Sequence, residues 1–194
     1  MDASTIILTL IWGLAIGCIY ILLAAGLNII FGVMKLVNFA HGQLLMIGAY
    51  LAYTVTVSTG LNAYLAIPVA MGGVAVLGIA VERFTFRRVL GTEKLNEIFI
   101  SLGLIYIFEN AAMLLWGEKS KQIVSPFAGL SLNLGGLFIT YDRIMAVLIV
   151  VAILVSFALL MKKTKIGLAI RATSQKSSTA MLMGINVDRV YLFT

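Results

Sequence analysis

The chain has 194 residues, of which 61% are apolar and only 11% are charged, and it carries a net charge of +6. Soluble domains are about 45–50% apolar and about 25% charged, so this composition excludes an ordinary soluble domain. Between Ala3 and Val81 the sequence has a single charged residue, Lys35. A stretch of that length holds several membrane spans of about 20 residues each. The sequence therefore predicts an all-α integral membrane protein, a polytopic helical bundle.

Charges and turn-forming residues divide the chain into five predicted spans. In chain order they cover residues 5–31, 36–57, 63–81, 95–117 and 144–161. The first is longer than a membrane requires, so we expect it to tilt, project or break, with Gly26 and Gly32 as the weak points. A further apolar run begins after Arg189, and we expect the chain to stop inside a sixth span.

Lys and Arg residues set the expected orientation, because they concentrate in cytoplasmic loops. Residues 82–94 hold four of them, residues 162–189 hold six, and the longer stretch 118–143 holds three. The two richer loops are separated by two spans, so both are expected in the cytoplasm. This places the N-terminus outside and residues 118–143 in the periplasm. Alternating apolar residues around a Gly-Gly pair in this outer loop are typical of a β-hairpin, with an irregular loop as the alternative.

Motifs for covalent chemistry are absent from the sequence. It has one histidine and one cysteine, Cys18, and it lacks a P-loop, a Gly-x-Ser-x-Gly motif and a Cys/His cluster. We therefore expect no enzyme, no catalytic residue, no metal and no cofactor. The positive charge lies in short loops, which is typical of membrane anchoring and not of nucleic-acid binding.

Polar residues interrupt the apolar sequence at the start of the second span. Asn38, His41 and Gln43 fall within six residues of one another. In a membrane such residues are costly unless they face protein or water, and broken helices of this kind line substrate paths in transporters. A packed network of hydrogen bonds between helices is the alternative.

The fourth span contains two acidic residues. Glu97 lies beside the basic loop and is expected to reach the membrane interface. Glu109 lies deeper, where either a pore role or a structural hydrogen bond is consistent with its position. The candidate residues of a translocation path are therefore Asn38, His41, Gln43 and Glu109.

The basic loop 162–189 contains a second candidate site. Residues 173–175 are a helix start signal, and the apolar patch 180–183 ends at Gly184. A short helix with an apolar patch lies on a lipid surface or fits a groove in a cytoplasmic partner. Ala180 and Gly184 are four residues apart, so on one helix they would share a face.

Several motifs together resemble one family of transport proteins. Residues 32–43 read Gly-Val-Met-Lys-Leu-Val-Asn-Phe-Ala-His-Gly-Gln, and residues 46–50 read Met-Ile-Gly-Ala-Tyr. This block resembles the signature of the branched-chain amino acid ABC-importer permeases of the LivH type, and Glu82-Arg83-Phe84 and residues 167–186 also fit it. The resemblance spans nearly the whole chain. It implies one permease domain over residues 1–194, incomplete at its C-terminal end.

The resemblance also implies a function and a set of partners. The chain would be the transmembrane subunit of an ATP-binding-cassette importer that forms the path for branched-chain amino acids in the plasma (inner) membrane of a bacterium or archaeon. Its partners would be a second permease subunit, two cytoplasmic ATPase subunits and a periplasmic or lipoprotein substrate-binding protein. A urea or amide permease of the same superfamily is the near alternative. A proton- or ion-coupled secondary transporter or channel is the alternative from another class.

ABC permeases carry a cytoplasmic coupling segment with the pattern Glu-Ala-Ala-x3-Gly. In this chain that register falls on Ser178-Thr179-Ala180 and Gly184, so only the alanine and the glycine agree. The resemblance implies a contact with the ATPase through this segment. The candidate coupling residues are Arg171, Ala172, Ser178, Thr179, Ala180 and Gly184.

Overall fold

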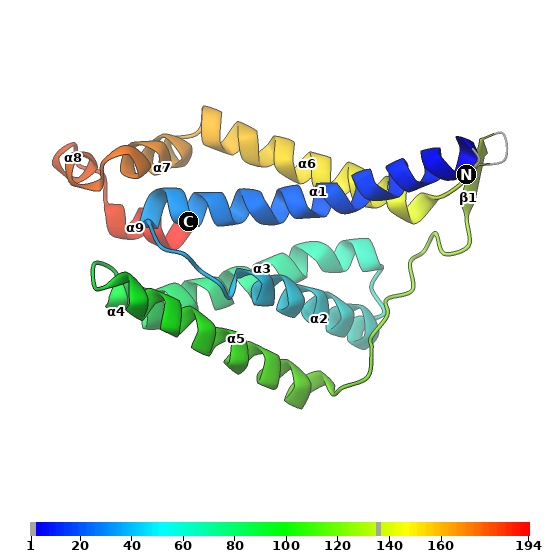
Figure 1. The fold of residues 1–194 in the computed structure, drawn as a ribbon, viewed down its shortest axis with the longest axis horizontal. Coiled ribbons are helices and arrows are strands. Elements are labelled where there is room, and N and C mark those ends of the chain that lie inside the picture. The colour runs from blue at the N-terminus through cyan, green and yellow to red at the C-terminus, as the bar shows by residue number, and fades with distance from the viewer. Residues whose placement is uncertain (1–2, 135–136) are drawn as a thin grey trace. The chain divides into compact units, whose positions relative to one another are not determined.

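The computed structural model describes residues 3–134 and 137–194, and helices dominate them (Figure 1). The elements in chain order are α1 (Ala3–Met34), α2 (His41–Thr59), α3 (Ala63–Val81), the π-helix η1 (Glu82–Phe86), α4 (Arg87–Val89), α5 (Lys94–Trp116), β1 (Ser131–Leu134), β2 (Leu137–Thr140), α6 (Tyr141–Lys163), α7 (Lys165–Gln175), α8 (Ser177–Leu182) and α9 (Val187–Phe193). The predicted class, a helical membrane protein with several spans, is confirmed.

Four helical stretches among the described residues are long and apolar enough to cross a membrane. They are Thr5–Met34, Ala63–Val89, Lys94–Trp116 and Tyr141–Lys163. Helix α2 occupies the remaining predicted span and has 19 residues, but its histidine, glutamine and hydroxyl residues make it less apolar. The count of five spans therefore stays a prediction.

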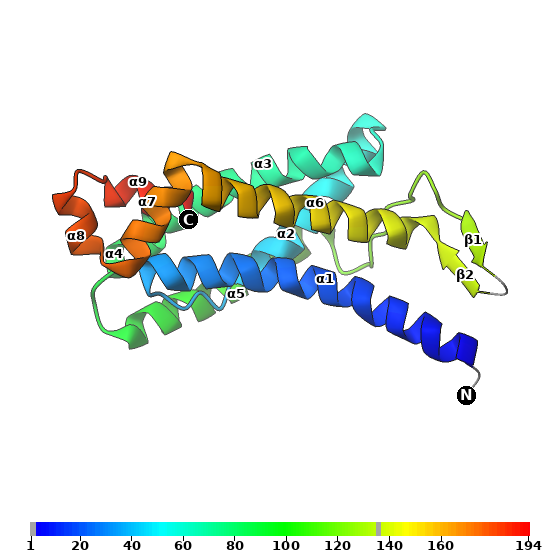
Figure 2. The ribbon, with the colours of Figure 1, turned by 90° about the horizontal axis from the view of Figure 1, so that it is seen from above.

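The chain forms two compact units, Met1–Gly26 with Val124–Leu168 and Leu27–Ile123 with Ala169–Thr194. In the first unit β1 pairs antiparallel with β2, with Ser131 opposite Thr140, and β2 leads directly into α6 (Figure 2). The predicted hairpin is confirmed, while its glycine pair lies outside the described residues. At the start of α6, Ser125 donates a hydrogen bond to Asp142.

Of the three alternatives expected for the long first span, which were a tilt, a projection or a break, the break does not form. Helix α1 is continuous through Gly26 and Gly32 to Met34, because a glycine inside a helix costs only about 1 kcal/mol relative to alanine. Lys35 then adopts a left-handed backbone with φ 57° and turns the chain out of the helix.

In the second unit α2 packs closely against α3, and the two lie side by side in Figure 1. A Cβ atom at Gly73 would lie 3.0 Å from the Leu51 Cδ1 atom, so a side chain at this position would require Leu51 to shift. The turn between the two helices follows its sequence, because Gly60 has φ 68° and the Asn62 side chain accepts the N–H of Tyr64 at 3.0 Å. The buried core cluster of this unit comprises Leu36, Ala40, Ile47, Val81, Phe86, Leu104 and Phe108.

Three predicted boundaries are wrong. The second span was expected to begin at residue 36, but α2 begins at His41. The predicted loop 82–94 is helical as far as Val89, because η1 and α4 continue α3. The signal at residues 173–175 marks the end of α7 and not the start of a helix, since Lys176 is extended with φ −159° and α8 begins after it.

Candidate functional site

The connection between α1 and α2 is an irregular backbone in which buried and exposed side chains alternate. Leu36 and Ala40 are buried in the core cluster. Asn38 is only 6% exposed, and its Oδ1 accepts the N–H of Ala40 at 3.0 Å. The N–H of His41 in turn donates to the Asn38 carbonyl at 3.3 Å, which starts α2. Non-helical backbone at membrane depth is tolerated only where protein or water surrounds it, and the core cluster covers the side on which Leu36 and Ala40 lie.

One polar pair joins α2 to α5. The Gln43 Nε2 atom donates a hydrogen bond to the Glu109 Oε1 atom at 2.9 Å. Gln43 is half-buried and Glu109 is exposed on the surface of the chain. A carboxylate on the outer face of a membrane span is costly against lipid, so such a residue faces a neighbouring subunit or water.

Aromatic side chains hold the same two helices together farther along. The Trp116 Nε1–H donates to the Thr54 Oγ1 atom at 2.7 Å, and the Trp116 ring stacks on Tyr50 with centroids 4.8 Å apart. These contacts fix α2 relative to α5, which sets the geometry of the pair between Gln43 and Glu109. The sequence did not single them out, because two aromatic residues so far apart in the chain carry no local pattern.

The structure brings Gln43 and Glu109 together. It places Asn38 and His41 in the turn at the start of α2. Glu97, which was expected to reach the membrane interface, lies in the first turn of α5 and is buried against its own chain. Within residues 3–134 and 137–194, no group of three or more His, Cys, Asp or Glu residues is placed to hold a metal ion.

The candidate coupling residues lie on α7, on α8 and just after α8. Arg171 is exposed and Ala172 half-buried on α7, and Ser178 and Thr179 are exposed on α8. Ala180 is only 4% exposed and therefore faces this chain itself. The expected shared face of Ala180 and Gly184 does not form, because α8 ends at Leu182.

Gly184 ends α8 as the sequence predicted. It has φ +81°, a backbone that favours glycine. Its N–H donates to the Met181 carbonyl at 3.0 Å, and the N–H of Ile185 donates to the Ala180 carbonyl at 3.1 Å. This pair of bonds is a Schellman motif, which closes a helix and reverses the chain.

The largest exposed apolar side chains of the segment lie at the end of α8. Leu182 is 88% exposed, and Met181 and Met183 are also exposed. A groove of about 450 Å³ adjoins them, lined by Met181, Gly184, Ile185, Asn186, Val187, Asp188 and Tyr191. Large exposed apolar residues such as these are typical of a surface that binds another protein. The sequence predicted this apolar patch, but it assigned the contact with the ATPase to Ala180.

A comparison with known protein families decides the assignment. The family model described as branched-chain amino acid transport system / permease component matches residues 9–194. The chain belongs to this family. The match includes the α1–α2 connection, the Gln43–Glu109 pair and the whole α7–α9 region, so both candidate sites of this permease-family member lie inside the matched residues.

Curated relatives agree with the family. The chain is similar to the high-affinity branched-chain amino acid transport system permease protein BraD of Pseudomonas aeruginosa, with 26% identity over 95% of this chain and 64% of the relative. It is 26% identical to LivH of Escherichia coli strain K12 over 94% of this chain and 63% of the relative. The probable permease LivH of Methanocaldococcus jannaschii is 30% identical over 90% of this chain and 56% of the relative. The chain thus spans less than two thirds of these relatives. No solved structure matches it.

Proposed function

We propose that this chain belongs to the transmembrane permease subunit of an ATP-binding-cassette importer and forms part of the path for branched-chain amino acids. The observation that carries the proposal is the family match over residues 9–194. The relatives named as branched-chain amino acid permeases support this substrate class. The protein would lie in the inner membrane of a bacterium or archaeon.

The proposed topology has five spans, with α2 as the second, and the start of a sixth at α9. Its N-terminus is outside, residues 82–94 and 162–189 are cytoplasmic, and residues 118–143 are periplasmic. The excess of Lys and Arg in the two cytoplasmic regions supports this orientation. Residues 1–194 then form a single transmembrane permease domain.

The proposed translocation path runs beside the turn that starts α2 and the adjoining face of α5. Asn38 and His41 shape the turn, while Gln43 and Glu109 supply the polar side chains that line the path. Their hydrogen bond at 2.9 Å on an exposed part of the chain supports this role. An amino acid carries an ammonium group, so the Glu109 carboxylate would attract that end of the substrate, and no covalent step is needed.

The proposed partners supply the energy and the substrate. Two cytoplasmic ATPase subunits would bind the α7–α8 region, a second permease subunit would complete the path, and a periplasmic or lipoprotein binding protein would deliver the substrate. The proposed coupling residues are Arg171, Ala172, Ser178, Thr179 and Gly184, and the buried Ala180 would support the segment from inside the chain. The exposed Leu182 at the end of α8 supports this docking. Arg171 adds charge that steers an acidic partner.

Uptake in proteoliposomes tests the proposal. The full permease is reconstituted with its ATPase and binding-protein partners, and labelled leucine is supplied with and without ATP. We expect uptake that needs ATP and survives a proton ionophore, and that unlabelled leucine inhibits but urea does not. Inhibition by urea alone would assign the related urea permease, and ATP-independent uptake abolished by the ionophore would assign a secondary transporter.

A further inference from the structure

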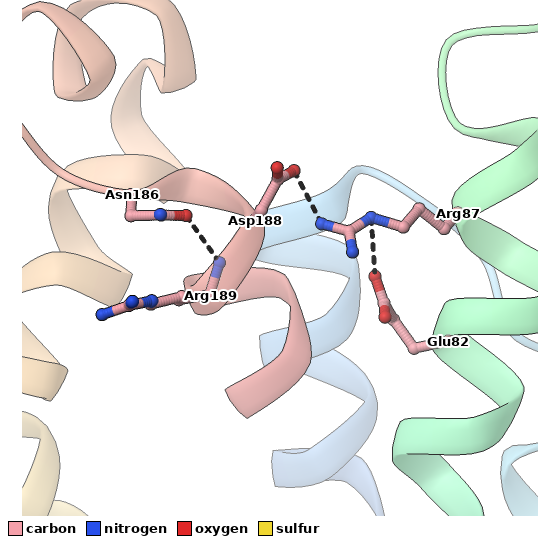
Figure 3. A network of polar contacts seen from close by, with 5 residues as sticks. All are labelled: Glu82, Arg87, Asn186, Asp188 and Arg189. Atoms are coloured by element: carbon pink, nitrogen blue, oxygen red, sulfur yellow. Dashed lines mark hydrogen bonds and ion pairs between the residues drawn. The ribbon is translucent and has the colours of Figure 1, made fainter.

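An ion-pair network connects η1 and α4, which continue α3, to the start of α9 (Figure 3). The Arg87 Nη2 atom lies 2.8 Å from the Asp188 Oδ1 atom. The Arg87 Nε atom lies 4.0 Å from the Glu82 Oε1 atom. In Figure 3 the guanidinium of Arg87 lies between the two carboxylates, while the side chain of Arg189 points away from it. We call Glu82, Arg87 and Asp188 the ion-pair link.

Burial of Glu82 holds Arg87 in place. Glu82 is 8% exposed, and among the described residues neither of its carboxylate oxygens has a hydrogen-bond partner. A buried carboxylate without compensation is strongly unfavourable, so the nearby positive charge of Arg87 is needed there. One edge of the guanidinium therefore stays with Glu82, and the other is available to an acidic residue outside the core.

The outer partner, Asp188, belongs to an element that a short turn joins to α8. The Asp188 side chain is 75% exposed, so its position is not fixed by packing against other side chains. It lies in the first turn of α9, whose start is fixed by the Asn186 side chain accepting the N–H of Arg189 at 3.0 Å. Only a four-residue turn, tied down by the Schellman motif at Gly184, separates α9 from α8.

We propose that Arg87 is a positioning residue that transmits movement of the α8–α9 segment to α3. This inference rests on the proposed ATP-driven function. When the ATPase partner displaces α8, the short turn carries α9 with it, and the ion pair between Asp188 and Arg87 pulls on the end of α3. Because Arg87 lies in the helical continuation of α3 through η1 and α4, the movement reaches a helix that packs against α2, which carries His41 and Gln43.

The test measures how many substrate molecules are imported for each ATP hydrolysed. In the full permease, reconstituted with its partners, Asp188→Asn removes the outer ion pair and leaves Glu82 and Arg87 intact. We expect normal membrane abundance and normal co-purification of the ATPase, with the ratio of uptake to ATP hydrolysis about fivefold lower, at the lower end of couplings between sites. Asp188→Glu keeps the charge and should restore the ratio.

Two further variants sharpen the test. Once Arg87→Gln is present, adding Asp188→Asn should change the ratio no further, because the ion pair with Asp188 has already been removed. Arg88→Gln removes the same charge from the exposed neighbouring position and should leave the ratio at the parent value. An unchanged ratio in Asp188→Asn would overturn the inference, as would loss of the ATPase from that variant, which would place Asp188 in the docking contact. If the parent itself shows no ATP-dependent uptake, the proposed function fails instead.

Discussion

Helices α2 and α5 carry polar side chains within an apolar part of the chain, whereas the end of α8 carries large apolar side chains within a basic and polar part. Gln43 and Glu109 satisfy each other across the first region. Leu182, at 88% exposed, has no such cover from the described residues of its own chain. Each region therefore departs from its surroundings, but in opposite directions.

This difference separates two kinds of contact. A polar pair in a membrane is tolerated when it is paired internally and faces protein or water, which suits a path for a charged solute. An exposed apolar cluster gains free energy only when another surface covers it, which suits docking of a partner. The first region should then be sensitive to changes in packing and pairing, and the second should be nearly insensitive until its partner binds.

The largest effect on stability is expected at Gly73, where α3 meets α2. Gly73→Leu forces a side chain against Leu51 and should lower the free energy of unfolding by about 1–3 kcal/mol. Gly72→Leu is the matched control, because nothing lies within 4 Å of a Cβ built at Gly72. Unfolding by SDS in bicelles measures both variants. Equal stability of the two would show that α2 and α3 do not approach closely at Gly73.

A smaller effect is expected for the pair between α2 and α5. Alanine at Gln43, at Glu109 and at both should give a coupling energy of about 0.6 kcal/mol, the average for hydrogen bonds between membrane helices, and no more than the measured maximum of about 1.7 kcal/mol. The same unfolding assay supplies the four values of this double-mutant cycle. Strict additivity would mean that the two side chains do not interact in the membrane.

The smallest effect on stability is expected at the end of α8. Leu182→Asp should change the free energy of unfolding by less than about 0.5 kcal/mol, since the side chain is exposed. The same variant should lose co-purification of the ATPase, because a charge cannot be buried cheaply at a docking surface. Leu182→Met retains the apolar volume and should keep the partner. Retention of the ATPase by Leu182→Asp would remove α8 from the interface.

The sequence predicted the helical membrane class, four of the apolar spans and the hairpin, because each depends on long or strictly alternating local patterns. It also predicted the turn at Gly184, where a single residue sets the backbone. Boundaries were missed where tertiary packing decides them: the apolar Leu36 reads as part of a helix, yet it is buried in a non-helical connection.

The sequence identified individual residues of the candidate sites but did not predict which of them contact one another. Gln43 and Glu109 were each singled out, but their contact joins positions 66 residues apart and has no sequence signal. Ala180 was assigned to the partner surface by its register, although it packs inside the chain. The link between Arg87 and Asp188 was missed for the same reason, because charged residues in two basic loops give no indication of which of them meet.

The most direct test of this account compares Glu109→Gln with Leu182→Asp in one reconstituted assay that records leucine uptake and ATP hydrolysis stimulated by the binding protein. The account predicts that Glu109→Gln retains the ATPase and its stimulated hydrolysis but loses uptake, because only the path is changed. It predicts that Leu182→Asp loses both, because the partner no longer docks. The same pattern in both variants would contradict the assignment of a path at α2–α5 and a docking surface at α8.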